Sequence, residues 1–266
     1  PPINGSRRWL PLKVFSLQPS ELAKLAVVVM LSVRLDKAGW RVELFKKGAL
    51  ESVIFIAILA GLIISEPDFG ATMVVGLVGF LLMFVAGVRV LHMLPFALVG
   101  LGGGLALVLT NANRLARLFD EDKQYQVKMA LAAIGNGEVF GVGLGQSMQK
   151  HLYLPEAHTD FIFAIGAEEL GMVYFSIPVL VLFFLFLALA VVIARNASAR
   201  FGRFLVVGMT FIIFFQAMFN IGVVAKAFPT KGMALPFFSY GGSSFLGFSI
   251  LLFSFLRIDA DRDRRL

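Results

Sequence analysis

Long apolar runs separated by short polar connectors dominate the chain. A helix that crosses the hydrocarbon core of a membrane needs about 20 apolar residues, and fewer where its ends are buried against protein. Seven runs qualify, and the fifth includes a lead-in that lies partly in the membrane: 22–35, 50–65, 69–88, 91–110, 161–194, 204–225 and 235–256. None of them alternates with the period of two that a barrel strand requires. We therefore predict an all-α polytopic membrane protein with about seven transmembrane helices, surrounded by membrane lipid.

The connectors between the runs are of two kinds that alternate along the chain. One kind is short and basic, and the positive-inside rule places it in the cytoplasm. Its basic residues are Arg34, Lys37, Arg41, Lys46, Lys47, Arg89, Arg195, Arg200, Arg203, Arg257, Arg262, Arg264 and Arg265. The other kind comprises the N-terminal segment and residues 65–70, 111–160 and 227–234, which then face outward. We interpret 111–160 as a large extracytoplasmic loop, a natural place for chemistry.

Composition agrees with a membrane protein and excludes several other classes. Of the 266 residues, 58% are hydrophobic and 15% are charged, whereas soluble domains contain about 45–50% and about 25%. The net charge of +7 comes from basic connectors that mark topology, so we expect no nucleic acid partner. The sequence has no Cys, which excludes disulfides and thiolate metal sites. The glycine-rich segment 141–147 lacks the Lys-Ser/Thr pair of a Walker loop, so we interpret it as a flexible loop and expect no nucleotide or organic cofactor.

Two polar clusters near the ends of the early runs are candidate sites, because ionisable groups at membrane depth are functional candidates by default. In QPSELAK, residues 18–24, Glu21 and Lys24 lie on one face of a helical turn. Two interpretations are open. Either the two residues mark a helix start with a local ion pair, or Glu21 holds Lys24 in a polar cavity that receives an anion. In SEPDFG, residues 65–70, a tight turn explains the proline and glycine but not Asp68, which favours a function.

The third cluster, LPEAHTDFIFAIGAEELG at 154–171, is the densest group of candidate acids and bases. Glu156, His158, Thr159 and Asp160 come directly before an apolar run. A carboxylate at a boundary of water and lipid is partly desolvated, which makes it a better general base near neutral pH. A solvated loop with helix-capping carboxylates fits the same pattern.

The fourth cluster, FPTKGMALPFFSYGGSSFLG at 228–247, interrupts the head of the last run. Its two prolines, Lys231 and its Gly-Ser break predict a broken or re-entrant helix, which membranes tolerate only beside a cavity. The backbone donors of the Gly-Ser break could hold an anion such as a phosphate. The candidate residues of that break are Ser239, Gly241, Gly242 and Ser243.

These four motifs, with NGSRRWL at 4–10 before them, closely resemble in sequence and order the SEDS family of bacterial cell-wall proteins (shape, elongation, division and sporulation). The TKG and LPFFSYGGSS segments resemble the division branch more than the elongation branch, and the sporulation type stays open. Members of this family have ten spans. The resemblance therefore implies that 1–266 is a single SEDS-type transmembrane domain that lacks its first three spans.

The resemblance implies a peptidoglycan glycosyltransferase that polymerises lipid II, an undecaprenyl pyrophosphate-linked disaccharide peptide, at the outer face of the bacterial cytoplasmic membrane. It implies a place at the division septum, with a class B penicillin-binding transpeptidase and other division proteins as partners. The catalytic aspartate of the family falls on Asp160, as the general base for the acceptor sugar's 4-hydroxyl. The Glu and Lys pair of the family falls on Glu21 and Lys24.

Departure of the pyrophosphate requires positive charge or a metal near the leaving group. Candidate cations in this sequence are Lys24, Lys231 and Arg7 or Arg8. A divalent cation, Mg or Mn, could instead lie between Asp160 and the pyrophosphate, but the spacing of the residues defines no ligand set for it.

Two other functions fit a polytopic protein with charges in its spans. A lipid II flippase should carry its critical charges near the bilayer midplane in paired broken spans, whereas here they gather towards the outer face. A noncatalytic scaffold for a transpeptidase would tolerate the change Asp160→Asn. Both functions remain alternatives to the glycosyltransferase at this point.

Overall fold

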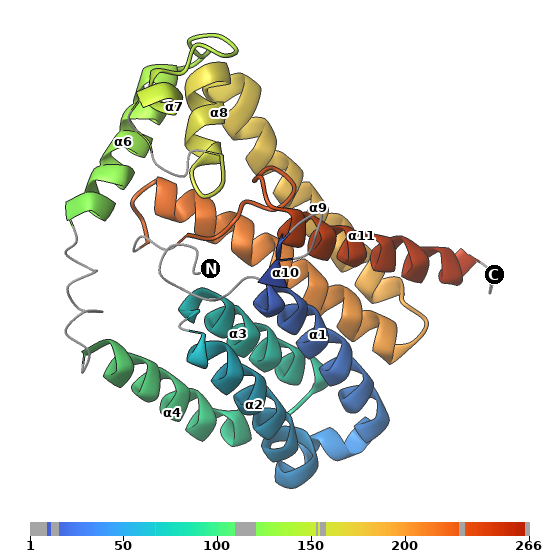
Figure 1. Cartoon of the computed structure of the whole chain (residues 1–266). Coiled ribbons are helices and arrows are strands. Elements are labelled where there is room, and N and C mark those ends of the chain that lie inside the picture. The colour runs from blue at the N-terminus through green and yellow to red at the C-terminus, as the bar shows by residue number, and fades with distance from the viewer. Residues whose placement is uncertain are drawn as a thin grey trace. The chain divides into compact units, whose positions relative to one another are not determined.

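A computed structural model describes residues 10–11, 16–66, 68–109, 121–152, 154, 158–228 and 232–263 (Figure 1). The chain divides into two compact units. Unit 1 draws on Pro1–Gly102, Ala188–Ile213 and Gly242–Leu266, and unit 2 on Gly103–Leu187 and Phe214–Gly241. Each unit therefore combines segments that are far apart in the sequence.

Unit 1 is a bundle of helices preceded by a short antiparallel ribbon. The ribbon pairs β1 (Leu10–Pro11) with β2 (Ser16–Leu17). A 3-10 turn (Gly39–Glu43) and a π-helical turn (Phe45–Leu50) connect α1 with α2. The helices are α1 (Pro19–Ala38), α2 (Glu51–Ser65), α3 (Phe69–Ala86), α11 (Gly242–Asp263) and parts of α4 (Val90–Leu109), α9 (Ile177–Asn196) and α10 (Arg200–Val224).

The core of unit 1 lies where α1 and α2 pack against α3 (Figure 1). Fully buried aliphatic side chains line this contact: Val27, Val28, Leu31 and Leu35 on α1, and Val74, Val75, Val78, Leu82 and Met83 on α3. Gly79 lets α2 approach α3, because a Cβ atom there would lie 2.4 Å from Ile56 Cδ1. At Gly76, also on α3, an added Cβ atom would meet no atom of a neighbouring element within 4 Å in the described structure.

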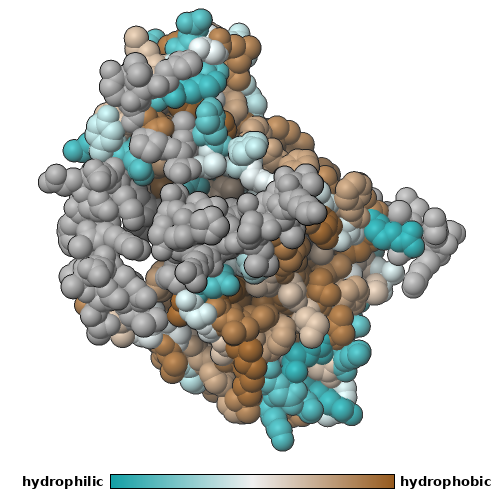
Figure 2. Space-filling model, in the orientation of Figure 1, coloured by the Kyte–Doolittle hydropathy of each residue, from teal (hydrophilic) through white to brown (hydrophobic). Residues whose placement is uncertain are grey.

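Helices occupy all seven predicted spans. Four of the described segments are long and apolar enough to cross a membrane: Phe45–Ser65, Phe69–Ala86, Ile162–Asn196 and Arg200–Val224. Two shorter apolar segments, Val90–Ala106 and Gly242–Ile258, lie within α4 and α11. Figure 2 shows hydrophobic surface along the helices and hydrophilic surface where the exposed Lys37, Arg41, Lys46 and Lys47 join α1 to α2. The chain is an integral membrane protein, as predicted.

The last helix begins later than predicted. The apolar run suggested a start at Leu235, but α11 begins at Gly242 and residues 232–241 are not helical. Phe237 has φ +67°, which a right-handed helix cannot include. The Ser239 hydroxyl accepts a hydrogen bond from the Leu235 amide at 2.7 Å, so a side chain replaces the missing helical partner. The predicted break in the span is therefore present, and it moves the start of the helix by seven residues.

Unit 2 contains two helices inside the segment predicted to be a loop. They are α6 (Glu121–Gly137) and α7 (Met148–Leu152), and α8 (Ile162–Gly171) and a π-helical turn (Met172–Ser176) lead into α9. Helix α6 buries Val127, Ala130 and Ala133, three residues apart, along one face. That stripe is narrow and weakly hydrophobic, which is why hydropathy alone did not reveal the helix.

Helix α6 and the segment after it approach α8 at backbone contact distance. A Cβ atom at Gly137 would lie 2.0 Å from the Ala167 carbonyl oxygen, and one at Gly141 would lie 2.3 Å from the Glu169 carbonyl oxygen. The Val142 amide donates a hydrogen bond to the Glu168 carbonyl at 3.0 Å. The glycine-rich segment predicted to be a flexible loop is therefore packed against the end of α8.

The buried side chain of Glu168 also stabilises the contact between α6 and α8. Its side chain is only 1% exposed, and its carboxylate accepts hydrogen bonds from Ser147 Oγ, from Asn136 Nδ2 at 3.3 Å and from the Gln149 amide at 3.4 Å. A buried carboxylate is stable only when such donors surround it. The residue therefore joins α6 and α7 to α8.

We expect Gly137→Ala to destabilise unit 2, because the new methyl group overlaps the Ala167 carbonyl oxygen on a backbone that cannot move aside. Overpacking of this kind costs about 1–3 kcal/mol or more. Gly135→Ala is the matched control, since no atom of a neighbouring element lies within 4 Å of its added Cβ atom in the described structure. Thermal unfolding of both variants in detergent should lower the midpoint only for Gly137→Ala. Equal midpoints would show that α6 does not pack on α8 in this way.

Candidate functional site

Three helices of unit 1 begin around one polar cluster. The main-chain amide of Gln18, just before α1, donates a hydrogen bond to the Oγ atom of Ser243. The distance is 3.0 Å, and Ser243 lies at the start of α11. Gln18 Nε2 and Ser20 Oγ donate to Asp68 Oδ2, just before α3, at 3.3 and 3.1 Å. We call Gln18, Ser20, Asp68 and Ser243 the helix-start cluster. Through it the starts of α1, α3 and α11 are held together.

Asp68 is the acceptor at the centre of this cluster. Its Oδ1 atom accepts a hydrogen bond from the Ala71 amide at 3.3 Å and so caps α3, while Oδ2 serves α1. The residue is 6% exposed, and the positive ends of the helix dipoles stabilise its negative charge. The sequence suggested that a turn does not require Asp68. The structure gives it a capping and bridging role.

Glu21 and Lys24 form the predicted ion pair one turn into α1. Lys24 Nζ lies 2.7 Å from Glu21 Oε1, and the lysine is only 2% exposed. A buried ammonium group must keep such a partner, because leaving it unpaired costs several kcal/mol, roughly 3–5. In this structure the Lys24 charge is therefore compensated within α1 and is turned away from solvent.

In unit 2, the chain from His158 to Asp160 is held residue by residue. The His158 carbonyl accepts a hydrogen bond from the Tyr240 amide at 3.0 Å, and the Thr159 carbonyl accepts one from Ser239 Oγ at 2.6 Å. The Asp160 carbonyl accepts one from Asn220 Nδ2 at 2.8 Å. Three consecutive carbonyl groups are thus fixed, and the third and fourth sequence motifs lie side by side.

Asn220 connects three segments of unit 2. It lies on α10, is 2% exposed, and donates a second hydrogen bond to the Met233 carbonyl at 2.7 Å. Its amide group therefore joins the main chain of Asp160 to the segment 232–241. Asn220 was not among the site residues predicted from the sequence. The available signal was an amide side chain in a mostly apolar span, which Asn220 shares with Gln216.

Gly232 lies against the carboxylate of Asp160. A Cβ atom added to Gly232 would be 2.1 Å from Asp160 Oδ2, far inside contact distance. Any larger residue would have to displace either the carboxylate or the segment 232–241. The glycine therefore allows main chain to pack directly on the side chain that sequence analysis identified as the catalytic candidate.

The predicted site residues fall into two groups, one in each unit. Unit 1 holds Glu21, Lys24, Asp68, Gly242 and Ser243, and unit 2 holds His158, Thr159, Asp160, Ser239 and Gly241. Arg7, Glu156 and Lys231, also predicted, lie outside the described residues, as does Arg8. Gly242 is the first residue of α11, and His158 contributes its carbonyl group to the contact with Tyr240.

The geometry around Asp160 suits proton transfer. The residue is half-buried in the turn just before α8 begins at Ile162, and its main chain is immobilised by Asn220. A general base acts efficiently when it is held in one orientation and remains within reach of the substrate. Among the residues that the structure describes, no three His, Asp or Glu side chains gather into a metal centre.

Comparison with known proteins identifies relatives over nearly the whole chain. Residues 1–264 match the FtsW/RodA/SpoVE family, described as "Cell cycle protein". The probable peptidoglycan glycosyltransferase FtsW of Trichlorobacter lovleyi is 39% identical over 92% of this chain and 66% of its own length. Stage V sporulation protein E of Bacillus subtilis is 41% identical over 91% of this chain and 68% of its own length.

A solved structure also shares the fold. It belongs to a study of how a peptidoglycan synthase complex coordinates polymerization and crosslinking. The similarity has a TM-score of 0.75 and 28% identity, and covers 98% of this chain and 75% of the other.

Fold and sequence together define a polytopic membrane protein of the bacterial cell-cycle class. The chain belongs to the FtsW/RodA/SpoVE family. It spans about two thirds of the length of the two relatives described above. The family and the fold predicted from the motifs are confirmed, and the predicted glycosyltransferase activity agrees with the name of the Trichlorobacter lovleyi relative.

We expect Asn220→Leu to destabilise unit 2, because it removes the donor from two carbonyl groups. Each buried carbonyl left without a partner costs about 1–3 kcal/mol. Gln216→Leu is the matched control on α10: Gln216 is 4% exposed, and its Oε1 atom has no partner among the described residues. The thermal midpoint should fall for Asn220→Leu and stay unchanged or rise for Gln216→Leu. A similar midpoint for both variants would refute the role of Asn220.

Proposed function

We propose that the protein is a peptidoglycan glycosyltransferase that polymerises lipid II at the outer face of the bacterial cytoplasmic membrane during cell division. The observation that carries this proposal is the fixed carboxylate of Asp160, held by Asn220 through its main chain and packed on Gly232. Family membership and the name of the Trichlorobacter lovleyi relative support the same reaction class.

Asp160 acts as the general base. The 4-hydroxyl oxygen of the acceptor sugar attacks the anomeric carbon of the donor and forms the glycosidic bond. The carboxylate takes the hydroxyl proton, the bond from the anomeric carbon to the pyrophosphate oxygen breaks, and undecaprenyl pyrophosphate leaves with the electron pair. Direct displacement inverts the anomeric carbon and needs no covalent intermediate, so no second catalytic carboxylate is required.

The backbone contacts of Asp160 supply the positioning that this reaction needs. Orientation of a catalytic group removes much of the entropic barrier, and a misplacement of about 1 Å can lower the rate by about 10²-fold. The hydrogen bonds from Asn220 and Ser239 restrain the main chain at Asp160 and Thr159. The carboxylate therefore needs little rearrangement when substrate arrives.

Charge compensation for the departing pyrophosphate is assigned to Lys231 and to Arg7 or Arg8. Positive charge aimed at a leaving anion acts strongly in a site from which water is excluded. Lys24 is a weaker candidate for direct contact, because it is buried and paired with Glu21 in this structure. We assign the Lys24 pair and the helix-start cluster the task of fixing the starts of α1, α3 and α11 relative to one another.

The expected Mg or Mn ion would be held by Asp160 together with the phosphates of the substrate rather than by a centre built from the described side chains alone. Such an ion prefers several oxygen ligands, typically about six for Mg. Asp160 is the carboxylate of the site, and no cluster of three candidate ligands occurs within the described ranges. We therefore derive no step through a metal.

A transpeptidase partner follows from the product. Glycan strands strengthen a wall only when they are crosslinked, and the similar solved structure comes from a complex that coordinates polymerization with crosslinking. We propose a class B penicillin-binding transpeptidase as the partner, together with other proteins of the division septum.

We expect Asp160→Asn to lower lipid II polymerisation by about 10²–10⁴-fold, the usual contribution of a general base. The intact protein should be purified with its transpeptidase, and glycan chains should be measured by gel. The charge-matched control is Asp36→Asn, which should retain activity. Asp36 is a half-buried aspartate near the C-terminal end of α1. The thermal midpoint and partner binding of both variants should remain those of the wild type.

Other outcomes of that measurement separate the alternatives. Normal polymer from Asp160→Asn would remove the general base from the proposal. Lipid II transport without polymer from the wild type would favour a flippase. Normal growth of cells that carry only Asp160→Asn would favour a scaffold.

We expect Gly232→Ala to reduce turnover by at least about 10-fold, because the added methyl group displaces either the Asp160 carboxylate or the segment 232–241 that packs on it. The loss should fall on kcat, with KM for lipid II little changed. Gly76→Ala is the control, since in the described structure no neighbouring element lies within 4 Å of its added Cβ atom. Unchanged turnover in Gly232→Ala, with unchanged stability, would contradict the proposed packing of main chain on the carboxylate.

A further inference from the structure

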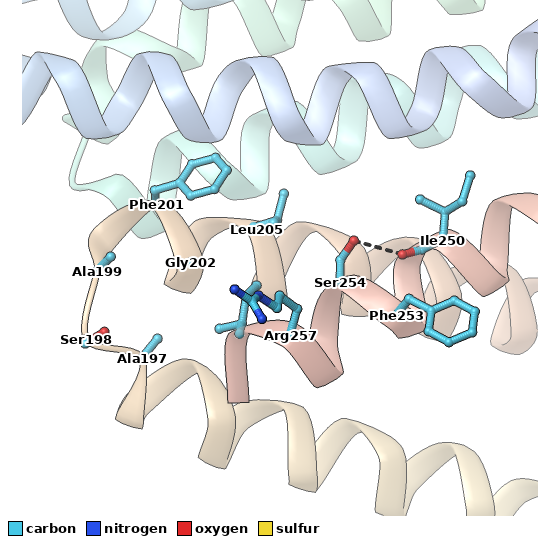
Figure 3. A pocket seen from close by; sticks show the side chains of 11 residues that line it. Ala197, Ser198, Ala199, Phe201, Gly202, Leu205, Ile250, Phe253, Ser254 and Arg257 are labelled. Atoms are coloured by element: carbon cyan, nitrogen blue, oxygen red, sulfur yellow. Dashed lines mark hydrogen bonds between the residues drawn. The ribbon is translucent and has the colours of Figure 1, made fainter. Parts of the chain in front are cut away.

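Unit 1 contains a cavity of about 540 Å³ that the proposed reaction does not use. It lies between the first turns of α10, the last turns of α11 and the α9–α10 turn at residues 197–199 (Figure 3). The positive-inside rule places this end of the helices at the cytoplasmic boundary of the membrane. The cavity therefore lies at the depth of lipid headgroups.

The walls of the cavity are apolar on one side and polar on the other. Phe201, Leu205, Ile250 and Phe253 form the apolar wall, and Phe253 is 71% exposed. Ser198, Ser254 and Arg257 form the polar part, and Figure 3 shows Arg257 reaching across from α11.

One of the residues that line the cavity is a glycine, which leaves space beside it. Gly202 lines the cavity on α10, and a Cβ atom there would already lie 3.4 Å from Ile258 Cγ2. The Ser254 hydroxyl donates to the Ile250 carbonyl of its own helix at 2.8 Å. Among the lining residues, Arg257 carries the charge.

Basic residues flank the α9–α10 turn that lines the cavity. Arg195, Arg200 and Arg203 are exposed on the two helix ends joined by the α9–α10 turn. The sequence has no acidic residue from 188 to 213, so this turn is purely basic. The tail after Arg257 alternates Asp with Arg and adds little net charge.

We propose that this cavity binds an anionic phospholipid of the cytoplasmic leaflet. The headgroup phosphate pairs with Arg257, and an acyl chain lies along the exposed Ile250 and Phe253 of α11. Basic pockets between transmembrane helices on the cytoplasmic side recognise anionic headgroups, and the apolar wall adds affinity that a soluble phosphate cannot gain. This site is independent of the proposed glycosyltransferase activity.

The test measures lipid binding by the intact protein purified in detergent. Phosphatidylglycerol, phosphatidylcholine and inorganic phosphate are titrated separately, and the shift of the thermal midpoint gives each apparent affinity. The variants are Arg257→Gln, which removes the charge, and Ser254→Leu, which fills the cavity and leaves Arg257 in place. Lys46→Gln, an exposed lysine of the α1–α2 connector, is the charge-matched control.

We expect phosphatidylglycerol to stabilise the wild type and Lys46→Gln equally, with no comparable effect of phosphatidylcholine or inorganic phosphate. Arg257→Gln should bind phosphatidylglycerol about fivefold more weakly, the usual value for one basic residue near an anionic lipid surface. Ser254→Leu should bind it at least as weakly. Equal stabilisation by both lipids, equal protection by inorganic phosphate, or equal affinity in all variants would each overturn the proposal.

Discussion

The need to satisfy main-chain polar groups wherever a helix is interrupted determines how this protein is built. In lipid, non-helical backbone is tolerated only where protein or a cavity supplies hydrogen bonds. Unit 2 interrupts its helices before α8, after α8 and before α11, and each interruption is met by specific donors. Asn220 and Ser239 serve the first and third, and the amides of residues 142 and 143 serve the carbonyl end of α8 at 3.0 and 2.9 Å.

The same constraint explains why the helix starts of unit 1 are polar. The first amides of a helix have no partner within it, and buried starts must obtain partners from side chains. Asp68 serves α3 and binds two side chains beside α1, while Ser243 accepts the amide that precedes α1. Residues that looked like candidates for chemistry on sequence grounds therefore also hold the bundle together. The burial of Asp68 and Ser243 shows that they serve the packing of the helices.

Apolar runs were enough to predict where the helices lie, four of which, in the part of the chain that the structure describes, are long and apolar enough to cross a membrane, because hydropathy is a local property of the chain. The position of the last helix, the existence of α6 and the role of Asn220 were not predictable in that way. Each depends on a contact between residues far apart in sequence: the Ser239 hydroxyl with the Thr159 carbonyl, α6 with α8, and Asn220 with Asp160. Motif order singled out Asp160 as the catalytic candidate, and the coordinates show that Asn220 holds its main chain.

Fixing Asp160 through its main chain has a chemical consequence. A carboxylate that accepts many hydrogen bonds is stabilised in its charged form and becomes a weaker base. Asn220 restrains Asp160 through its main-chain carbonyl group. This hydrogen bond positions the residue without stabilising the charged form of its carboxylate. Gly232 also positions the side chain in this way, because its close packing limits where the carboxylate of Asp160 can lie. These two restraints therefore limit where the Asp160 side chain can lie without themselves making the carboxylate a weaker base.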